Sequence, residues 1–425
     1  MKKPKILIVS AAALGFRFWE KNRKADFWNR LNARPVKTVF PALTCPVQAS
    51  FRTASEPASH GMFASGVFNR EIRKTFFWEQ SSGLYEGARI WDKFRENGGR
   101  VGQICWQNSL GNESDLLLSP APVHKHHGGM IQAFYSRPER LYGDICSKIG
   151  SKFNLFNYWG PFTSIKSSRW ITDTTCEILK SASAPDLLLA YIPHLDYDLQ
   201  KFGPESDKAA RAFKETEFML EKLFATAKLA NFEIGIFGDY AITPAQKAIF
   251  PNRILLDKGY FSVRSVKGML YPDLWSSKAF AMVDHQIAHV YIQNKNDIEN
   301  VRKILSGIDG IKTIHNHSEM NHKNAGDLIL EAEAGHWFAY HWWNNKSEMP
   351  DYATHVDIHS KPGFDPCELF MSIWPPMSIS SDTTKIKGTH GSANSPEHEV
   401  FWGATFDSGD PGTITGAAKA LKQIL

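Results

Sequence analysis

Short apolar runs that alternate with longer helix-like segments are the feature that most limits the folds open to this chain. The runs are Ile6–Val9, Leu187–Ile192, Ile234–Phe237, Ala279–Val283 and Ala288–Ile292. Helical patterns follow two of them, at Lys208–Leu229 and Asp297–Leu305. Continuous apolar runs are typical of strands buried on both faces, and alternation with helices favours parallel crossover connections. The pattern predicts an α/β fold with a central, mostly parallel sheet covered by helices.

The length of the chain predicts more than a single simple core. It has 425 residues, whereas single cores usually stop growing at ~250–300 residues. We expect one domain over residues 1–425 with an inserted subdomain. The stretch from about Gly66 to Gly160 breaks the rhythm of strands and helices and is rich in Gly, His and aromatic residues. We interpret residues 66–160 as an elaboration or cap over the sheet.

The charge of the chain limits the classes of partner that it is expected to bind. Charged residues make up 22% of the sequence and the net charge is +5, without a dense Lys/Arg run. A nucleic-acid binder would concentrate its positive charge, so none is expected as a partner. No run approaches the ~18 apolar residues of a membrane span, so no membrane is expected either. A small anionic substrate fits this mild basic excess, and the oligomeric state is left open.

Cysteine usage and the N-terminus predict a cytoplasmic location. The five cysteines are far apart and include no CxxC pair, which argues against a disulfide framework or a thiolate zinc site. The basic start is followed by the apolar run Ile6–Leu14, which imitates a signal peptide. About nine apolar residues are short for a signal core, so we interpret the run as a first buried strand.

Thr44 is the candidate nucleophile. The apolar, β-branched segment Val36–Phe40 predicts a strand, and Cys45–Arg52 lacks glycine and can form a helix. Thr44 would then lie near a helix N-terminus, where backbone N–H groups attract an oxyanion. The alternative is that Thr44 only caps the helix.

Two acids and a histidine are the candidate metal ligands. Asp196 follows the run Leu187–Ile192, and Asp239 follows Ile234–Phe237, so each is expected at the carboxyl end of a strand. His390 lies between flexible residues near the C-terminus. Zinc accepts carboxylate and imidazole ligands, and a metal beside Thr44 would stabilise its alkoxide. We therefore predict one divalent metal, zinc, held by these three residues, although each acid alone fits a cap or turn as well.

The motifs resemble those of the alkaline phosphatase superfamily, in particular its nucleotide pyrophosphatase/phosphodiesterase and phosphonoacetate hydrolase branches. The matching segments, in chain order, are Thr44–Gln48, His60–Met62, His194–Asp196, Gly238–Asp239, Asp284–Tyr291 and His390–Gly391. The resemblance implies an α/β/α sandwich and a threonine that carries the phosphoryl or nucleotidyl group during turnover. It also implies two metals, of which one is held by an Asp, a His four residues later and a C-terminal His.

The chain departs from that pattern at the metal centre. The segment Ser10–Gly15 has no carboxylate where the family has a metal-binding Asp, and Gln200 and Tyr240 stand where it has histidines. A usual two-zinc centre is therefore not expected. A divergent branch of predicted nucleotide pyrophosphatases or phosphodiesterases is more similar, through Pro193–Gln200 and the acid–Tyr pair; it also shares the segments Trp159–Pro161, His355–His359 and Lys361–Pro366.

Two hypotheses follow for the function. The first is a hydrolase that acts on a phosphate ester, phosphodiester or phosphonate through Thr44 with a reduced or altered metal centre. The second is a non-catalytic binding protein for a small anionic or aromatic metabolite. Residues that would complete a rebuilt site are His194, Gln200, Tyr240 and His359.

Overall fold

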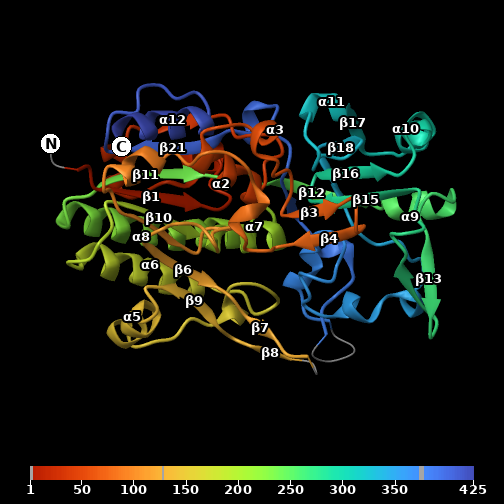
Figure 1. The fold of residues 1–425 in the computed structure, drawn as a ribbon, viewed down its shortest axis with the longest axis horizontal. Helices are drawn as coiled ribbons and strands as arrows, with labels where there is room; N and C mark the ends of the chain where they lie inside the picture. Colours follow the sequence, from red (N-terminus) through yellow and green to blue (C-terminus); the bar gives the residue numbers. More distant parts are fainter. Residues whose placement is uncertain (1–2, 127–128, 373–377) are drawn as a thin grey trace.

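A twisted eight-stranded sheet forms the centre of the larger lobe of the computed structural model, which describes residues 3–126, 129–372 and 378–425 (Figure 1). The strands, in spatial order, are β2 (Arg34–Val36), β21 (Val400–Ala404), β11 (Glu233–Gly238), β1 (Ile6–Ala11), β10 (Leu187–Ile192), β5 (Val101–Ile104), β6 (Leu116–Pro120) and β9 (Phe134–Arg137). All pairs from β11 to β6 are parallel, and the outer pairs are antiparallel. The predicted α/β fold with a mostly parallel central sheet is confirmed.

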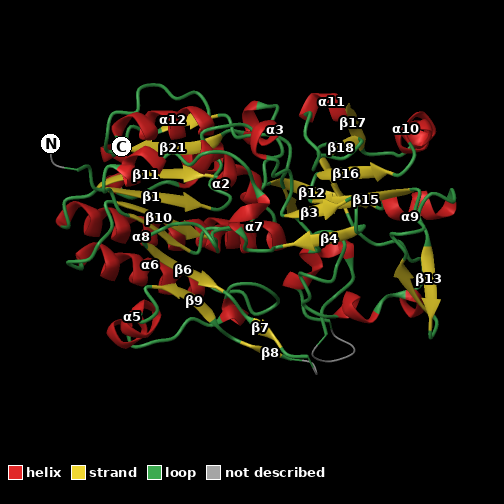
Figure 2. Cartoon of the chain, in the orientation of Figure 1, coloured by secondary structure: helices red, strands yellow, loops and turns green. Residues whose placement is uncertain are grey.

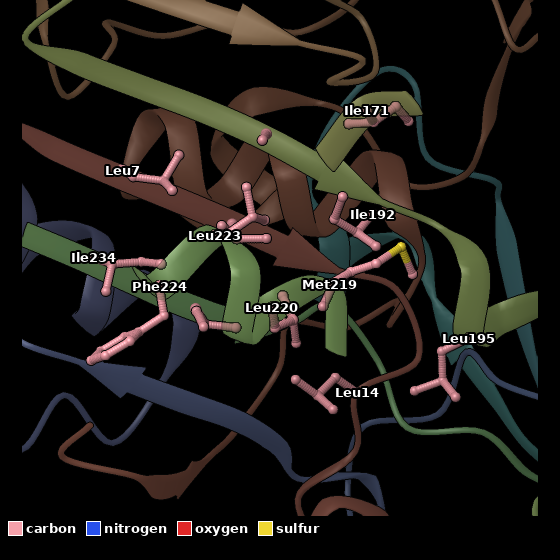
Figure 3. Packing of buried hydrophobic residues seen from close by; sticks show 14 of the residues in the cluster. Leu7, Leu14, Ile171, Ile192, Leu195, Met219, Leu220, Leu223, Phe224 and Ile234 are labelled. Atoms are coloured by element: carbon pink, nitrogen blue, oxygen red, sulfur yellow. The ribbon is translucent and has the colours of Figure 1, made fainter. Parts of the chain in front are cut away.

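Helices cover both faces of this sheet, as Figure 2 shows. Alternate side chains of β1 enter two separate cores, because successive residues of a strand point to opposite faces. Leu7 and Val9 pack with α6 (Ile165–Lys180) and α8 (Asp207–Leu229), and Figure 3 shows Leu7 near Leu223 of α8. Ile6 and Ile8 pack with α2 (Thr44–Thr53) and α12 (Ile414–Ile424) on the other face. The apolar runs found in the sequence are buried on both faces for this reason.

The smaller lobe contains an antiparallel sheet in the order β15 (Ala279–Asp284), β16 (Ile287–Ile292), β18 (Leu328–Ala332) and β17 (Ile311–Asn316). The runs Ala279–Val283 and Ala288–Ile292 are therefore buried strands, as expected, but they do not join the parallel sheet. Only His285 and Gln286 separate β15 from β16, and a connection this short permits only antiparallel pairing.

Residues 66–160 contribute to more than one part of the molecule. Three of their strands, β5, β6 and β9, lie in the central sheet. Two hairpins lie outside it, formed by β3 (Gly66–Asn69) with β4 (Lys74–Phe77) and by β7 (Val123–His124) with β8 (Met130–Ile131). The extent of the predicted elaboration stays a prediction.

The segment before Thr44 differs from the expected strand. β2 ends at Val36, and an irregular segment leads to Leu43, directly before α2. Pro41 has no N–H group for a strand ladder, so the sheet cannot continue up to the helix. Within the described part of the chain, no helix is long and apolar enough to cross a membrane.

Candidate active site

A cavity of about 1100 Å³ opens beside the carboxyl ends of the central strands. Thr44, Asp196, Gln200, Tyr240 and His390 all line it. They come from the start of α2, from α7 (His194–Phe202) after β10, from the loop after β11, and from the segment after β20 (Gly388–Thr389). Loops that follow parallel strands meet at one edge of a sheet, which is why these distant residues converge.

Thr44 is the first residue of α2, as the sequence predicts. The first backbone hydrogen bond into the helix runs from the Val47 N–H to the Leu43 carbonyl. Within the described residues, the backbone N–H groups of Thr44 and Cys45 have no acceptor. These two donors and the helix dipole favour negative charge next to the Thr44 hydroxyl.

The Thr44 hydroxyl begins a chain of hydrogen bonds. Thr44 Oγ1 donates to the phenolic oxygen of Tyr240 over 3.5 Å, and that phenol donates to Asp196 Oδ1 over 2.9 Å. Gln200 Nε2 donates to the other Asp196 oxygen over 2.8 Å. The two residues that replace family histidines therefore both bind Asp196. Burial raises the pKa of Asp196.

Asp239 lies behind the cavity wall rather than on it. Its Oδ1 accepts the backbone N–H groups of Ala13 and Tyr240, both over 3.0 Å, and no described group binds its Oδ2. Burial raises the pKa of Asp239 to about 8, so the carboxyl is protonated at neutral pH. Asp239 thus joins the loop after β1 to the start of the Tyr240 loop.

Replacing Asp239 by asparagine should flatten the pH dependence of stability. The unfolded state loses the Asp239 proton near pH 4 and the folded state near pH 8, so the unfolded state binds fewer protons between these values. The free energy of unfolding of the parent should therefore fall by up to about 1.4 kcal/mol between pH 6 and pH 7 from this group alone. Urea denaturation at both pH values measures the difference. If Asp239 instead held a metal as an anion, Asp239→Asn would lower stability at pH 7 and leave the slope unchanged.

His390 supports Tyr240. Its Nδ1 donates to the Ala42 carbonyl over 2.8 Å, and its ring stacks on the Tyr240 ring with 3.5 Å between centroids and 1° between planes. Burial, and next the charge of His285, lowers the pKa of His390 well below its usual range. A neutral imidazole therefore fixes the plane of the phenol.

His285 is part of the cavity wall, although the sequence alone does not predict it as a site residue. The motif Asp284–Tyr291 matches the family pattern, but its position beside apolar strands favours a structural role. In the structure, the His285 ring lies 3.8 Å from the His390 ring and 3.9 Å from the Phe364 ring, between centroids. The two-residue turn between β15 and β16 places His285 there. The two apolar runs separated by only His285 and Gln286 are the sequence signal for this hairpin and for the position of His285 at its turn.

The predicted metal ligands do not fit the two-metal centre that the resemblance implies. Both oxygens of Asp196 already accept hydrogen bonds, one oxygen of Asp239 accepts two, and the Tyr240 ring lies flat against His390. Within residues 3–126, 129–372 and 378–425, no group of three or more His, Cys, Asp or Glu side chains is arranged to hold a metal ion. The zinc on Asp196, Asp239 and His390 stays a prediction, and the Asp196 oxygens would have to exchange their hydrogen bonds to bind it.

Two further candidates for a rebuilt site lie away from Thr44. His194 is outside the cavity, where its Nε2 pairs with Glu215 over 2.8 Å. His359 lines the cavity, but its Nδ1 donates to the Phe77 carbonyl. Of the four residues proposed to complete the site, only Gln200 and Tyr240 contact Asp196.

The rest of the cavity wall is rich in aromatic side chains and carries no permanent positive charge among the described residues. Trp159 and Trp78 face Phe364, with 5.7 and 6.2 Å between ring centroids. Among the described residues, no Lys or Arg side chain lines the cavity. Such a wall suits a ligand with a flat or apolar group, and the anion-attracting groups are the N–H donors of α2.

Comparisons with known proteins agree with this architecture. A sequence model of the family described as Type I phosphodiesterase / nucleotide pyrophosphatase matches residues 25–365. An uncharacterized pyrophosphatase/phosphodiesterase of Schizosaccharomyces pombe is 23% identical over 250 residues, which are 57% of this chain and 43% of that protein. The chain therefore spans less than half the length of that curated relative.

Solved structures share the fold. Murine ectonucleotide pyrophosphatase/phosphodiesterase 5 superposes with a TM-score of 0.63 at 14% identity, over 99% of this chain and 94% of that one. Phosphonoacetate hydrolase from Sinorhizobium meliloti 1021, in complex with phosphonoformate, gives 0.64 at 13% identity, over 100% and 96% of the two chains. With its family sequence match over most of its length and this shared fold, the chain belongs to the type I phosphodiesterase/nucleotide pyrophosphatase family.

Proposed function

We propose that this protein is a hydrolase that cleaves a phosphate ester, phosphodiester or phosphonate of a small molecule, with Thr44 as the nucleophile. The observation that carries the proposal is the position of Thr44, which lines one large cavity at the start of α2, where neither its own backbone N–H nor that of Cys45 has an acceptor among the described residues. The small anions in relatives agree with it: phosphonoformate in the phosphonoacetate hydrolase and AMP in an inactive variant of the murine phosphodiesterase. A cytoplasmic location, which the unpaired cysteines support, belongs to the same proposal.

Different residues of the chain would have different roles in such a reaction. Thr44 Oγ1 attacks phosphorus, and the N–H groups of Thr44 and Cys45 donate to the phosphoryl oxygens as negative charge develops. The buried position of Thr44 limits access of bulk water, which strengthens both interactions. The aromatic wall binds the rest of the substrate. Water then cleaves the threonyl ester to release the phosphate or phosphonate.

A non-catalytic binding function is the second candidate, and two observations favour it. Among the described residues, no Lys or Arg side chain lines the cavity wall, and both oxygens of Asp196 already accept hydrogen bonds. A protein with this cavity would retain a small aromatic metabolite without cleaving it.

Turnover and binding measured on the same preparation distinguish the two functions. The purified chain is assayed with p-nitrophenyl phosphate, bis(p-nitrophenyl) phosphate and p-nitrophenyl phenylphosphonate, with and without added divalent metals. We expect release of p-nitrophenol from at least one of them. Binding of a non-hydrolysable aryl phosphonate by calorimetry, without turnover of any ester under any metal condition, would instead establish the binding protein.

A further inference from the structure

We infer that Tyr240 is a catalytic residue that, with Asp196, activates Thr44 through a hydrogen-bonded relay in place of a resident metal. The inference rests on the proposed function, because it assigns how the same threonine becomes a nucleophile. Members of this family depend on divalent metals, whereas in this chain hydrogen bonds link Thr44 to Tyr240 and both oxygens of Asp196 to Tyr240 and Gln200.

The geometry of the relay is continuous from the nucleophile to a buried carboxylate. Among the described side chains, Tyr240 alone forms a hydrogen bond with Thr44 Oγ1. The Tyr240 hydroxyl in turn donates to Asp196 Oδ1 over 2.9 Å. The 3.5 Å separation between Thr44 and Tyr240 is long for a hydrogen bond, but such catalytic contacts commonly tighten when substrate binds. When Asp196 is ionised it can only accept, so the donors then run from Thr44 through Tyr240 to Asp196.

Each member of the relay is held in place by its own neighbour. His390 stacks on the Tyr240 ring, and the Gln200 amide fixes the carboxylate of Asp196 by binding the oxygen that Tyr240 leaves free. Asp239 accepts the backbone N–H of Tyr240 itself. The phenol of Tyr240 has one proton to donate and lone pairs that accept, so it can pass a proton between its two neighbours. Gln200 and His390 are positioning residues in this arrangement.

The chemical step balances without an added co-reactant. The bond from Thr44 Oγ1 to phosphorus forms while the bond from phosphorus to the leaving oxygen breaks. The Thr44 proton moves to the Tyr240 oxygen, and the Tyr240 proton moves to Asp196 Oδ1. The leaving group departs with its electron pair and takes a proton from solvent. In the second step, water attacks phosphorus and releases a proton to solvent while the bond from phosphorus to Thr44 Oγ1 breaks, and the Asp196 proton returns through Tyr240 to that oxygen.

Two single variants and their combination test the relay. Tyr240→Phe removes the phenolic oxygen and keeps the ring that stacks on His390, and Asp196→Asn removes the proton acceptor with little change of shape. We expect each to lower kcat ~10²–10⁴-fold, with KM changed by less than about threefold. The double variant should be no slower than the slower single variant, because both residues act in one chain.

Tyr340→Phe is the matched control. Tyr340 is as buried as Tyr240, its hydroxyl has no described partner, and it does not line the cavity. Its kcat and KM should equal those of the parent. Protein freed of metal by a chelator should also keep its rate, since the relay supplies the activation.

The outcomes separate this inference from the proposed function. If Thr44→Ala is inactive while Tyr240→Phe and Asp196→Asn turn over at the parent rate, Thr44 remains the nucleophile and the relay is wrong. Additive losses in the double variant would also contradict the relay. Loss of activity on chelation, with recovery at one equivalent of a transition metal, would assign the activation to a metal. A parent without turnover would overturn both proposals together.

Discussion

Thr44→Ala is expected to lower kcat by at least ~10³-fold against any ester that the parent hydrolyses. Thr44 is the first residue of α2 and lines the cavity, and the variant lacks the hydroxyl that attacks phosphorus. Residual turnover should come only from the N–H donors and from binding. Aryl ester hydrolysis under substrate saturation gives kcat, and ligand calorimetry shows whether the cavity still binds. The expected result is binding within a few-fold of the parent without turnover.

Two variants control for damage to the helix. Thr44→Ser keeps the hydroxyl, and we expect it to retain far more activity than Thr44→Ala. Thr53→Ala changes the other end of the same helix, where the Thr53 hydroxyl donates to the Ala49 carbonyl and pairs with the Ser55 hydroxyl, and its kcat should not change. Parent-like turnover by Thr44→Ala would remove Thr44 from the chemistry.

Lys361→Met is expected to lower the free energy of unfolding by ~3–5 kcal/mol. Lys361 is 1% exposed, and its Nζ lies 2.8 Å from an Asp365 oxygen and 2.6 Å from a Glu368 oxygen. Without the ammonium group, two carboxylates remain buried close together with no cation between them. Urea denaturation at pH 7 measures the loss.

The same ion pairs also hold part of the cavity wall. Glu368 accepts the indole N–H of Trp159 over 2.6 Å and the backbone N–H of Asp357 over 3.0 Å. Both of these residues line the cavity, so Lys361→Met should weaken ligand binding as well as stability.

Neutralising the two acids provides the internal control for Lys361. The triple variant with Asp365→Asn and Glu368→Gln should recover part of the lost stability, because the uncompensated charges are gone. Lys222→Met, which removes an exposed pair with Asp173, should change stability by less than ~1 kcal/mol. Equal stability of Lys361→Met and the parent would show that the buried pairs do not hold this segment.

Much of the central sheet can be predicted from the sequence because both faces of its strands are buried. The run Leu187–Ile192 coincides with β10, and Ile6–Val9 lies within β1. The pairing of β15 with β16 could not be predicted from their apolar character alone, since buried parallel and antiparallel strands look alike in the sequence. The short turn at His285 decides it.

The site shows a similar division. The position of Thr44 at a helix N-terminus follows from local sequence, and Gln200 and Tyr240 in place of histidines indicate an altered centre. The contact between Gln200 and Asp196 is local, one turn apart in α7, but Thr44, Asp196 and Tyr240 lie on three segments far apart in the chain. Only the packed structure brings them together, so the relay could not be predicted from spacing.

Trapping of the covalent intermediate tests the central claim most directly. The parent and Thr44→Ala are mixed with the best ester from the screen, quenched in acid during turnover, digested and examined by mass spectrometry. We predict a phosphoryl or phosphonyl group on Thr44 of the parent and none on the peptide of the variant. Turnover by the parent with an unmodified Thr44, or with the group on another residue, would contradict the account.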